Sequence, residues 1–317
     1  MQKIISCDWG TSSLRLRIVD VDKMISLAET VSEHGVFITY NLWNENGRAE
    51  NERLSFYQTI LKKEIKKLEG QAEFSLENMP LIISGMASSS IGMIEMAYAE
   101  IPFKAGVSGL LTKTINAVND FAYKTLIISG VRKENDVMRG EETQLIGCMG
   151  NDTGDQLFIF PGTHSKHVTV QNGRLVDFAT FMTGEFFGLL SGKSILSGSI
   201  EKSDEVSDIK NQESFERGVI DGSTLNLLHS SFLVRTNDLF HTLSKRENYF
   251  YLSGLLIGTE LKEIKTVRIP ITVVSDAAQA KLYSLALQKL GMQEVSYYDA
   301  GEALVAGHCK IYKNTNQ

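Results

Sequence analysis

The order of apolar and polar positions along the chain predicts short strands and helices in alternation. Three candidate strands follow one another at residues 3–8, 12–20 and 24–32. In the second of them Leu14, Leu16 and Ile18 alternate with polar residues, which is the two-residue period of a half-buried strand. The economical interpretation is a three-stranded meander at the start of the fold.

The same order of elements begins again near the middle of the chain. Asn172-Gly173 is a strong hairpin signal between two strand patterns, so a second meander is expected there. The other strands are predicted at 80–84, 125–129, 156–160, 164–170, 174–181, 269–275 and 294–298. The helices are predicted at 52–69, 141–149, 186–193, 221–228, 251–262, 277–290 and 302–312.

The two halves also share a short motif. Gly10-Thr11-Ser12-Ser13 follows the first strand of the first half, and Gly162-Thr163-His164-Ser165 follows the first strand of the second. With the repeated strand order, this match favours a duplicated unit. We therefore expect two α/β domains, 1–152 and 153–317, joined through the polar, glycine-containing stretch 150–155. The last helix could pack back on the first domain.

Composition narrows the class of protein. The chain has 317 residues, of which 43% are apolar and 22% charged, with a net charge of −6 and no basic run. These values disfavour a protein that binds nucleic acid or an anionic membrane surface. We find neither a signal-peptide pattern nor an apolar run long enough to span a bilayer.

Three widely spaced cysteines give neither a disulfide framework nor a zinc site, so we expect reduced thiols in the cytoplasm. Small molecules are then the expected partners. The oligomeric state stays open, a homodimer included.

The segment that begins with Asp8 carries the first candidate chemistry. A turn of glycine and small hydroxyl residues, Gly10 to Ser13, lets backbone N–H groups approach an anion closely. Mg²⁺ commonly uses one or two carboxylates together with phosphate oxygens, so Asp8 is a candidate metal ligand and catalytic residue. An ordinary hairpin with Asp8 as a turn-capping residue remains the alternative.

A second turn of the same kind contains Gly162, Thr163, His164, Ser165 and Lys166. Two such turns could hold a polyphosphate from opposite sides of a cleft, with Lys166 as a point charge. The chain has neither a Walker motif nor a GxGxxG fingerprint, so it would hold phosphates in another way.

Residues 136–143 place Arg139 and two acids, Glu141 and Glu142, just before a predicted helix. Arg139 could hold a carboxylate or the transferring phosphoryl group, and one acid could accept a hydroxyl proton. The alternative is structural, because acids in a first helical turn suit the helix dipole.

Three further segments are candidates for ligand contact. Thr183 precedes a predicted helix and fits an N-cap, with Glu185 close behind it. Gly254 and Gly258 lie four residues apart in a helical pattern, which favours close helix packing over ligand contact. The stretch from Ser275 through Asp276 to Ala277 joins a strand to a helix, where an adenosine could rest against the helix N-terminus.

The stretches DWGTSSLR, DVMRGEETQLIG, PGTHSKHV, FMTGE and LSGLLIG resemble those of the 2-dehydro-3-deoxygalactonokinase family in letters, order and spacing, over residues 4–307. The resemblance implies two ribonuclease-H-like domains of the sugar kinase/Hsp70/actin superfamily with a cleft between them. It implies transfer of the ATP γ-phosphoryl group, with Mg²⁺, to the 6-hydroxyl of 2-dehydro-3-deoxy-D-galactonate in galactonate breakdown.

By position, the resemblance makes 8–13 the first phosphate turn, 162–165 the second and 274–278 the adenosine junction. This chain has Ser275-Asp276 where the superfamily usually has glycine, so nucleotide preference stays open. We place four side chains at the substrate: Arg15, Arg139, Thr183 and Glu185.

Three rival functions remain. The first is a kinase for another sugar acid, such as 2-dehydro-3-deoxygluconate. The second is a non-catalytic ATP switch of the actin/Hsp70 type, which the dense cluster at 139–142 disfavours. The third is a sugar-responsive repressor, which would need an added helix-turn-helix and a basic surface.

Overall fold

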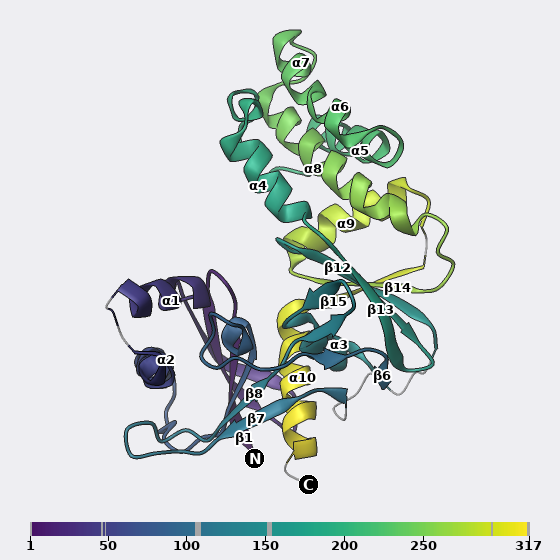
Figure 1. The fold of residues 1–317 in the computed structure, drawn as a ribbon. Coiled ribbons are helices and arrows are strands. Elements are labelled where there is room, and N and C mark those ends of the chain that lie inside the picture. Colours follow the sequence, from purple (N-terminus) through teal and green to yellow (C-terminus); the bar gives the residue numbers. More distant parts are fainter. Residues whose placement is uncertain are drawn as a thin grey trace. The chain divides into compact units, whose positions relative to one another are not determined.

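The computed structural model describes residues 2–45, 47, 49–104, 109–150, 154–292 and 294–315. The chain divides into two compact units (Figure 1). The first comprises Met1–Gly154, Val170–Asp177 and Ala300–Gln317, and the second comprises Asp155–Thr169 and Phe178–Asp299. The expected boundary between residues 152 and 153 falls outside the described residues.

The first unit is built on a six-stranded sheet with the order β3-β2-β1-β4-β8-β7. The predicted meander is confirmed, because β1, β2 and β3 pair antiparallel in sequence order. Strand β4 then runs parallel to β1, and β8 parallel to β4. The strands are β1 (Lys3–Trp9), β2 (Leu14–Asp20), β3 (Ile25–Ser32), β4 (Leu81–Gly85), β7 (Thr112–Ile115) and β8 (Thr125–Ile128).

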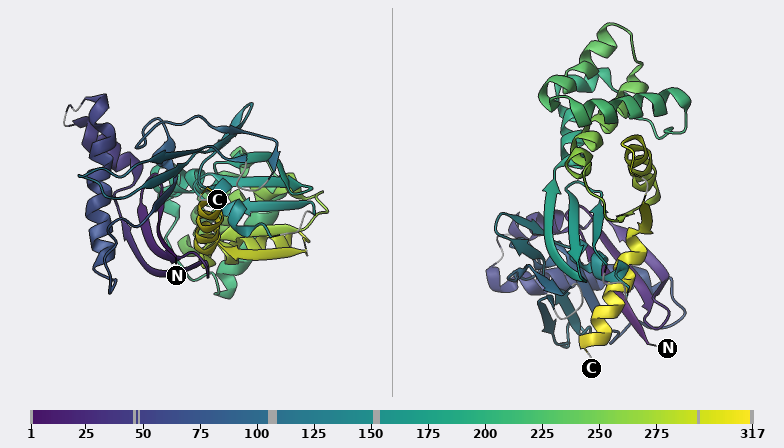
Figure 2. Two further views of the ribbon diagram at one scale, coloured as in Figure 1. Left: turned by 90° about the horizontal axis from the view of Figure 1, so that it is seen from below. Right: turned by 90° about the vertical axis from the view of Figure 1, so that its right-hand side faces the viewer.

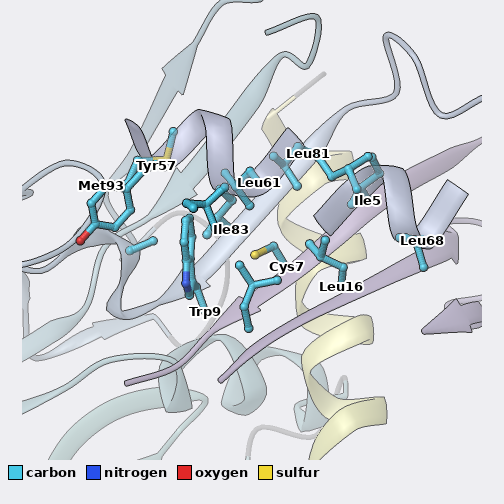
Figure 3. Close-up of a cluster of buried hydrophobic side chains, with 14 of the residues drawn as sticks. Ile5, Cys7, Trp9, Leu16, Tyr57, Leu61, Leu68, Leu81, Ile83 and Met93 are labelled. Carbon is cyan, nitrogen blue, oxygen red and sulfur yellow. The ribbon is translucent and has the colours of Figure 1, made fainter. Parts of the chain in front are cut away.

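Strand β1 is buried on both faces. Ile5, Cys7 and Trp9 join a core with Tyr57 and Leu61 of α2 (Arg53–Glu69), as Figure 3 shows. The predicted helix 52–69 is thereby confirmed. Helix α1 (Val36–Glu45) and the short 3-10 turns η1 (Glu50–Glu52) and η2 (Met86–Ser88) complete this side of the unit.

The other face of β1 meets the last helix. In α10 (Ala300–Thr315) the buried His308 hydrogen-bonds Ser6 of β1 through Nδ1 at 2.7 Å and Ser84 of β4 through Nε2 at 3.0 Å. Burial and the nearby Arg17 lower the pKa of His308 to about 3, so this imidazole is neutral. Both chain ends lie in this unit (Figure 2).

Helix α10 also crosses α3 (Glu141–Cys148) at very short range. A Cβ on Gly147 would lie 1.7 Å from the Ala303 carbonyl oxygen, and one on Gly307 would lie 2.1 Å from that of Thr143. Lys310 of α10 donates to the carbonyls of Ile146, Gly147 and Met149 at 2.7–2.9 Å, which satisfies the C-terminal end of α3. Helix α10 therefore holds α3 in place.

A small three-stranded sheet precedes α3. It consists of β5 (Ala99–Glu100), β9 (Val131–Lys133) and β10 (Asp136–Met138). Strand β10 delivers the chain to Arg139 and α3.

The second unit carries parallel strands that continue into the second meander. Its sheet has the order β15-β14-β11-β12-β13, followed by β6 (Phe103–Lys104), which pairs with the end of β13 that belongs to the first unit. The strands are β11 (Gln156–Phe160), β12 (Ser165–Gln171), β13 (Arg174–Phe181), β14 (Ile271–Ser275) and β15 (Val295–Asp299).

Two long helices of this unit pack through glycines. A Cβ on any of four glycines of α5 and α8 would lie 2.0–2.2 Å from a carbonyl oxygen of the facing helix. The packing predicted for Gly254 and Gly258 is confirmed, and their counterparts are Gly218 and Gly222. The helices are α4 (Thr183–Lys193), α5 (Ile209–Thr224), α6 (Leu227–Ser231), α7 (Leu233–Leu239), α8 (Lys245–Leu261) and α9 (Ala277–Lys289), with 3-10 turns η4 (Ile195–Ser199) and η5 (Lys262–Ile264).

The helix predicted at 221–228 is wrong. Helix α5 ends at Thr224, and Asn226 starts α6 by accepting a hydrogen bond from the Leu228 N–H at 3.0 Å. Helices α1 and α7 and most of α5 were not predicted. In the described part of the chain, every helix is too short or too polar to cross a bilayer.

The α3–α10 crossing yields a stability prediction. Gly147→Ala should lower the free energy of unfolding by about 1–3 kcal/mol or more, because its methyl group meets backbone that cannot move aside. Gly188→Ala in α4 is the matched control, since nothing lies within 4 Å of a Cβ placed on Gly188. There, alanine should be neutral or stabilising by up to about 1 kcal/mol. Urea unfolding of both variants measures the difference, and equal midpoints would contradict the crossing.

Candidate functional site

The first glycine turn is held by backbone hydrogen bonds. Gly10 N–H donates to the Ser13 carbonyl at 2.9 Å, and α1 donates to the turn through the N–H groups of Val36 and Phe37 at 2.9 and 3.1 Å. Gly35 lies so close that a Cβ there would be 2.3 Å from the Ser12 carbonyl carbon. The side chains of Thr11, Ser12 and Ser13 remain exposed, so this turn can meet a ligand.

Asp8, one residue before the end of β1, lies beside a cluster of charges. Its carboxylate lies 4.0 Å from the Arg15 guanidinium, which also approaches Glu29 at 3.6 Å. The partial burial of Asp8 raises the pKa of its carboxyl group. The positive charges of Arg15 and Arg17 lower this pKa, and the negative charge of Glu141 raises it again. The structure therefore brings Glu141, which is distant in the sequence, close to Asp8 and Arg15.

Two glycines let the backbone segments around Asp8 approach. Strand β4 pairs with β1 so that Gly85, at φ +87°, lies opposite Trp9, and a Cβ there would be 2.8 Å from the Trp9 carbonyl. Gly140 has φ +113°, a conformation that favours glycine, and a Cβ on it would lie 3.7 Å from the Gly85 Cα. Gly85 thus permits the close approach of β4 to β1, and Gly140 permits the backbone bend that precedes α3.

Arg139 precedes this bend and is held on several sides. Its Nη1 donates to the Ser88 hydroxyl at 2.5 Å, and its guanidinium carbon lies 4.4 Å from the centre of the Tyr98 ring. Its backbone N–H donates to the Glu141 carboxylate at 3.0 Å. Ser88 and Tyr98 were not predicted as site residues, because neither is near Arg139 in sequence.

The two neighbouring acids occupy different surroundings. Glu142 is 1% exposed and accepts from the Gly140 N–H at 2.7 Å and from the Thr143 hydroxyl at 3.0 Å. Burial, with a contribution from Glu141, raises the pKa of Glu142 to about 7. Glu141 is partly exposed and acts on Asp8. Glu142 therefore stabilises the start of α3 from its buried side, whereas Glu141 lies towards the charges around Asp8.

The second glycine turn is held by side chains. Gly162 N–H donates to the buried Ser165 hydroxyl at 3.3 Å, and Lys166 Nζ donates to the His164 carbonyl at 3.0 Å. Gly162, Thr163 and His164 are exposed, whereas Lys166 is 5% exposed. The exposed backbone of the turn is thus the part available to an anion.

The start of α4 closes on this turn. A Cβ on Gly184 would lie 2.6 Å from the Gly162 carbonyl, and Glu185 N–H donates to the Thr163 carbonyl at 3.0 Å. The Glu185 carboxylate reaches His164 Nε2 at 2.5 Å. The N-cap expected at Thr183 is wrong, because Met182 occupies the cap position and the Thr183 hydroxyl donates instead to the Glu260 carboxylate.

At the strand–helix junction the acid has a structural partner. Asp276 is the N-cap of α9, and its carboxylate accepts from the Gln279 N–H at 2.8 Å. Ser275 is buried and donates to the Asp276 carbonyl at 3.0 Å, and Ala277 opens the helix. Capping accounts for a carboxylate at this position.

A pocket of about 120 Å³ lies in the second unit beside the turn. Its walls come from the turn, the start of α4, one face of α8 and one face of α9. The lining residues are Gly162, Thr183, Gly184, Phe187, Tyr249, Phe250, Ser253, Leu256, Ile257, Gln279, Leu282 and Tyr283. The pocket is thus largely apolar, with a few polar groups, as small-molecule sites are.

Three buried residues at this pocket were not predicted as site residues: Tyr283, which lines it, and His167 and Glu260. The contacts between them join residues 23 and 93 positions apart, so no local pattern reveals them. Among the described residues, no group of three or more His, Cys, Asp or Glu side chains is arranged to hold a metal ion.

Comparison with known proteins gives a consistent result. The model of the 2-keto-3-deoxy-galactonokinase family matches residues 8–311. The Rhizobium meliloti (strain 1021) protein named "Probable 2-dehydro-3-deoxygalactonokinase DgoK1" is 32% identical over 95% of this chain and 93% of its own length. The Escherichia coli (strain K12) 2-dehydro-3-deoxygalactonokinase is 28% identical over 91% and 90%.

A solved structure is similar as well. It is that of a candidate 2-dehydro-3-deoxygalactonokinase from Sinorhizobium meliloti, with a TM-score of 0.80 and 29% identity, covering 98% of this chain and 96% of its own.

The burial of Glu142 predicts a pH dependence. Its pKa rises from 4.5 in the unfolded chain to about 7 on folding, so its contribution to stability is present at low pH and is lost as the pH rises between these values. The loss amounts to about 3 kcal/mol. Glu142→Gln, which stays neutral, should therefore lose less stability than the parent protein between about pH 5 and pH 8.

Thermal unfolding at both pH values measures this effect. Glu134→Gln, which removes the same charge from an exposed turn, should behave like the parent protein. An equal loss in all three proteins would show that Glu142 is charged throughout this range.

Proposed function

Since the chain belongs to the 2-keto-3-deoxy-galactonokinase family, we propose that it transfers the γ-phosphoryl group of ATP to the 6-hydroxyl of 2-dehydro-3-deoxy-D-galactonate. The observation that carries the proposal is the family match over residues 8–311, which includes both glycine turns and the acidic segment between them. The reaction would serve galactonate breakdown in the cytoplasm.

The second unit is the proposed nucleotide half-site. The pocket between α8 and α9 would take the adenosine, with Tyr249, Ser253 and Gln279 among its walls. Gly162 lines the same pocket, so a nucleoside bound there would direct its phosphates towards the exposed turn of Gly162, Thr163 and His164. Backbone N–H groups of such a turn bind phosphate oxygens.

The residues around Asp8 fit Mg²⁺. A carboxylate at a strand end that is 31% exposed, beside the exposed hydroxyls of the first turn, suits an ion that keeps several waters and also binds phosphate. Asp8 would hold the ion, and the charge of Glu141 would add to its attraction. When bound, Mg²⁺ would neutralise charge on the phosphates.

The first unit is the proposed acceptor half-site. Glu141 is better placed than Glu142 to accept the hydroxyl proton, because it is partly exposed while Glu142 is buried and satisfied. Arg139, fixed by Ser88 and Tyr98, would pair with the carboxylate of the sugar acid. Arg15 would add positive charge beside it.

We further propose that both units are ribonuclease-H-like domains of the sugar kinase/Hsp70/actin superfamily and that the two half-sites face each other across a cleft. Phosphoryl transfer then needs both substrates to be positioned together, and domain closure would exclude the water that otherwise hydrolyses ATP. His164 and Glu185 pair with each other in the nucleotide half-site, so Glu185 would contact the sugar acid only on closure.

An assay of ADP release with ATP and Mg²⁺ tests the function. We expect turnover with 2-dehydro-3-deoxygalactonate, much weaker turnover with 2-dehydro-3-deoxygluconate, and only background without an acceptor. Phosphorus NMR of the product should place the phosphate at position 6. Equal ADP release with and without a sugar acid would favour an ATP switch instead, and activity confined to a plain hexose would contradict a sugar-acid kinase.

The two neighbouring acids give an internal comparison of catalytic roles. Glu141→Gln should lower kcat by about 10²–10⁴-fold with little change in either KM, as expected for the loss of a general base. Glu142→Gln should lower kcat far less, because its carboxylate faces Gly140 and Thr143. Steady-state kinetics of both variants decide, and the reverse order of effects would assign the base to Glu142.

A further inference from the structure

A buried carboxylate ends a chain of hydrogen bonds that begins at the second glycine turn. Gly162 N–H donates to Ser165 Oγ at 3.3 Å, and Ser165 Oγ lies 3.1 Å from the Tyr283 hydroxyl. The Tyr283 hydroxyl donates to Glu260 Oε2 at 2.8 Å. Ser165, Tyr283 and Glu260 are each at most 2% exposed, so water does not replace these bonds.

The carboxylate sets the direction of the whole chain. The Tyr283 hydroxyl donates its one proton to Glu260, so the tyrosine oxygen can only accept from Ser165. The Ser165 oxygen is then left to accept from Gly162. Hydrogen bonds aligned in this way polarise one another, so each link strengthens the next.

The other partners of Glu260 extend this network to both sides of the turn. The Thr183 hydroxyl, at the start of α4, donates to Glu260 Oε2, and His167 Nε2 donates to Oε1 at 2.9 Å. Thr183 and Tyr283 also line the pocket that Gly162 lines. One carboxylate thus ties together the turn, the first residue of α4 and one wall of the pocket.

We propose that Glu260 is a positioning residue for nucleotide binding, which holds the second glycine turn and the start of α4 in the geometry that accepts the phosphates of ATP. The inference rests on the proposed function, in which this turn meets the phosphates. Glu260 itself is 2% exposed and acts through Tyr283, Ser165 and Thr183.

Tyr283→Phe tests the proposal, because it removes the link between Glu260 and Ser165 while it keeps the ring. We expect KM and Kd for ATP to rise about three- to tenfold, the effect of one lost hydrogen bond of ordinary strength. The KM for the sugar acid should stay within about twofold, since no bond of the network reaches the first unit's acidic segment.

Tyr251→Phe is the matched control. Tyr251 is also fully buried in the second unit and donates to a carboxylate, that of Asp221, at 2.8 Å, but it does not line the pocket. Both variants should lose similar thermal stability, whereas only Tyr283→Phe should weaken ATP binding. Equal ATP affinity in the two variants would overturn the proposal and leave the network a purely structural one.

Two more variants separate the remaining explanations. Ser165 is buried and does not line the pocket, so Ser165→Ala should reproduce the ATP effect and add little to Tyr283→Phe. Full additivity would mean that Tyr283 acts by direct contact with the nucleotide. Gly184→Ala pushes a methyl group against the turn, 2.6 Å from the Gly162 carbonyl.

Gly184→Ala separates the positioning role of Glu260 from the proposed phosphate site at the second glycine turn. If it weakens ATP binding and Tyr283→Phe does not, the turn binds phosphate but Glu260 does not position it. If neither variant changes ATP binding, the turn is not the phosphate site and the proposed half-site is wrong.

Discussion

The crossing of α3 and α10 is the contact on which the acidic segment depends. No side chain fits at its centre, where Gly147 and Gly307 bring each helix against a carbonyl of the other. Lys310 then satisfies the C-terminal carbonyls of α3, which would otherwise lack partners. Because α3 cannot slide along α10, its first turn is fixed beside β1, and Glu141 acts on Asp8 at a constant position. The packing of α3 on α10 thereby fixes where the Glu141 side chain acts on Asp8.

The structure keeps two buried carboxylates in contrasting ways. Glu260 has three hydrogen-bond partners, His167, Thr183 and Tyr283, so both of its carboxylate oxygens are satisfied in the core. Glu142 has two donors and lies beside another acid, and its pKa rises to about 7. The first arrangement suits a permanent anchor, because removal of one donor leaves others in place. The second suits a residue that fixes the start of α3 from the buried side, while the neighbouring acid, Glu141, stays partly exposed.

Local pattern was enough to predict most strands, and two of them, β11 and β13, begin and end at the predicted residues. Local pattern failed where an N-cap separates two helices, as at Asn226. An asparagine within a helical pattern does not reveal that its side chain will accept a hydrogen bond from the backbone of the next turn. In the candidate site, sequence patterns located both glycine turns and the acids of α3. They could not locate Glu260, whose role comes from partners on β12, α4 and α9 that only the fold brings together.

The two glycine turns share letters but differ in what supports them. In the first, the Gly10 N–H finds a backbone carbonyl, and the N–H groups at the start of α1 hold the turn from outside. In the second, the Gly162 N–H finds the Ser165 side chain, and the support runs through buried side chains to Glu260. The shape of the second turn therefore depends on each of these buried side chains, because the links of such a network strengthen one another. Similar motifs can thus persist in both halves while the residues that keep them in shape differ, which is why a motif match alone does not identify them.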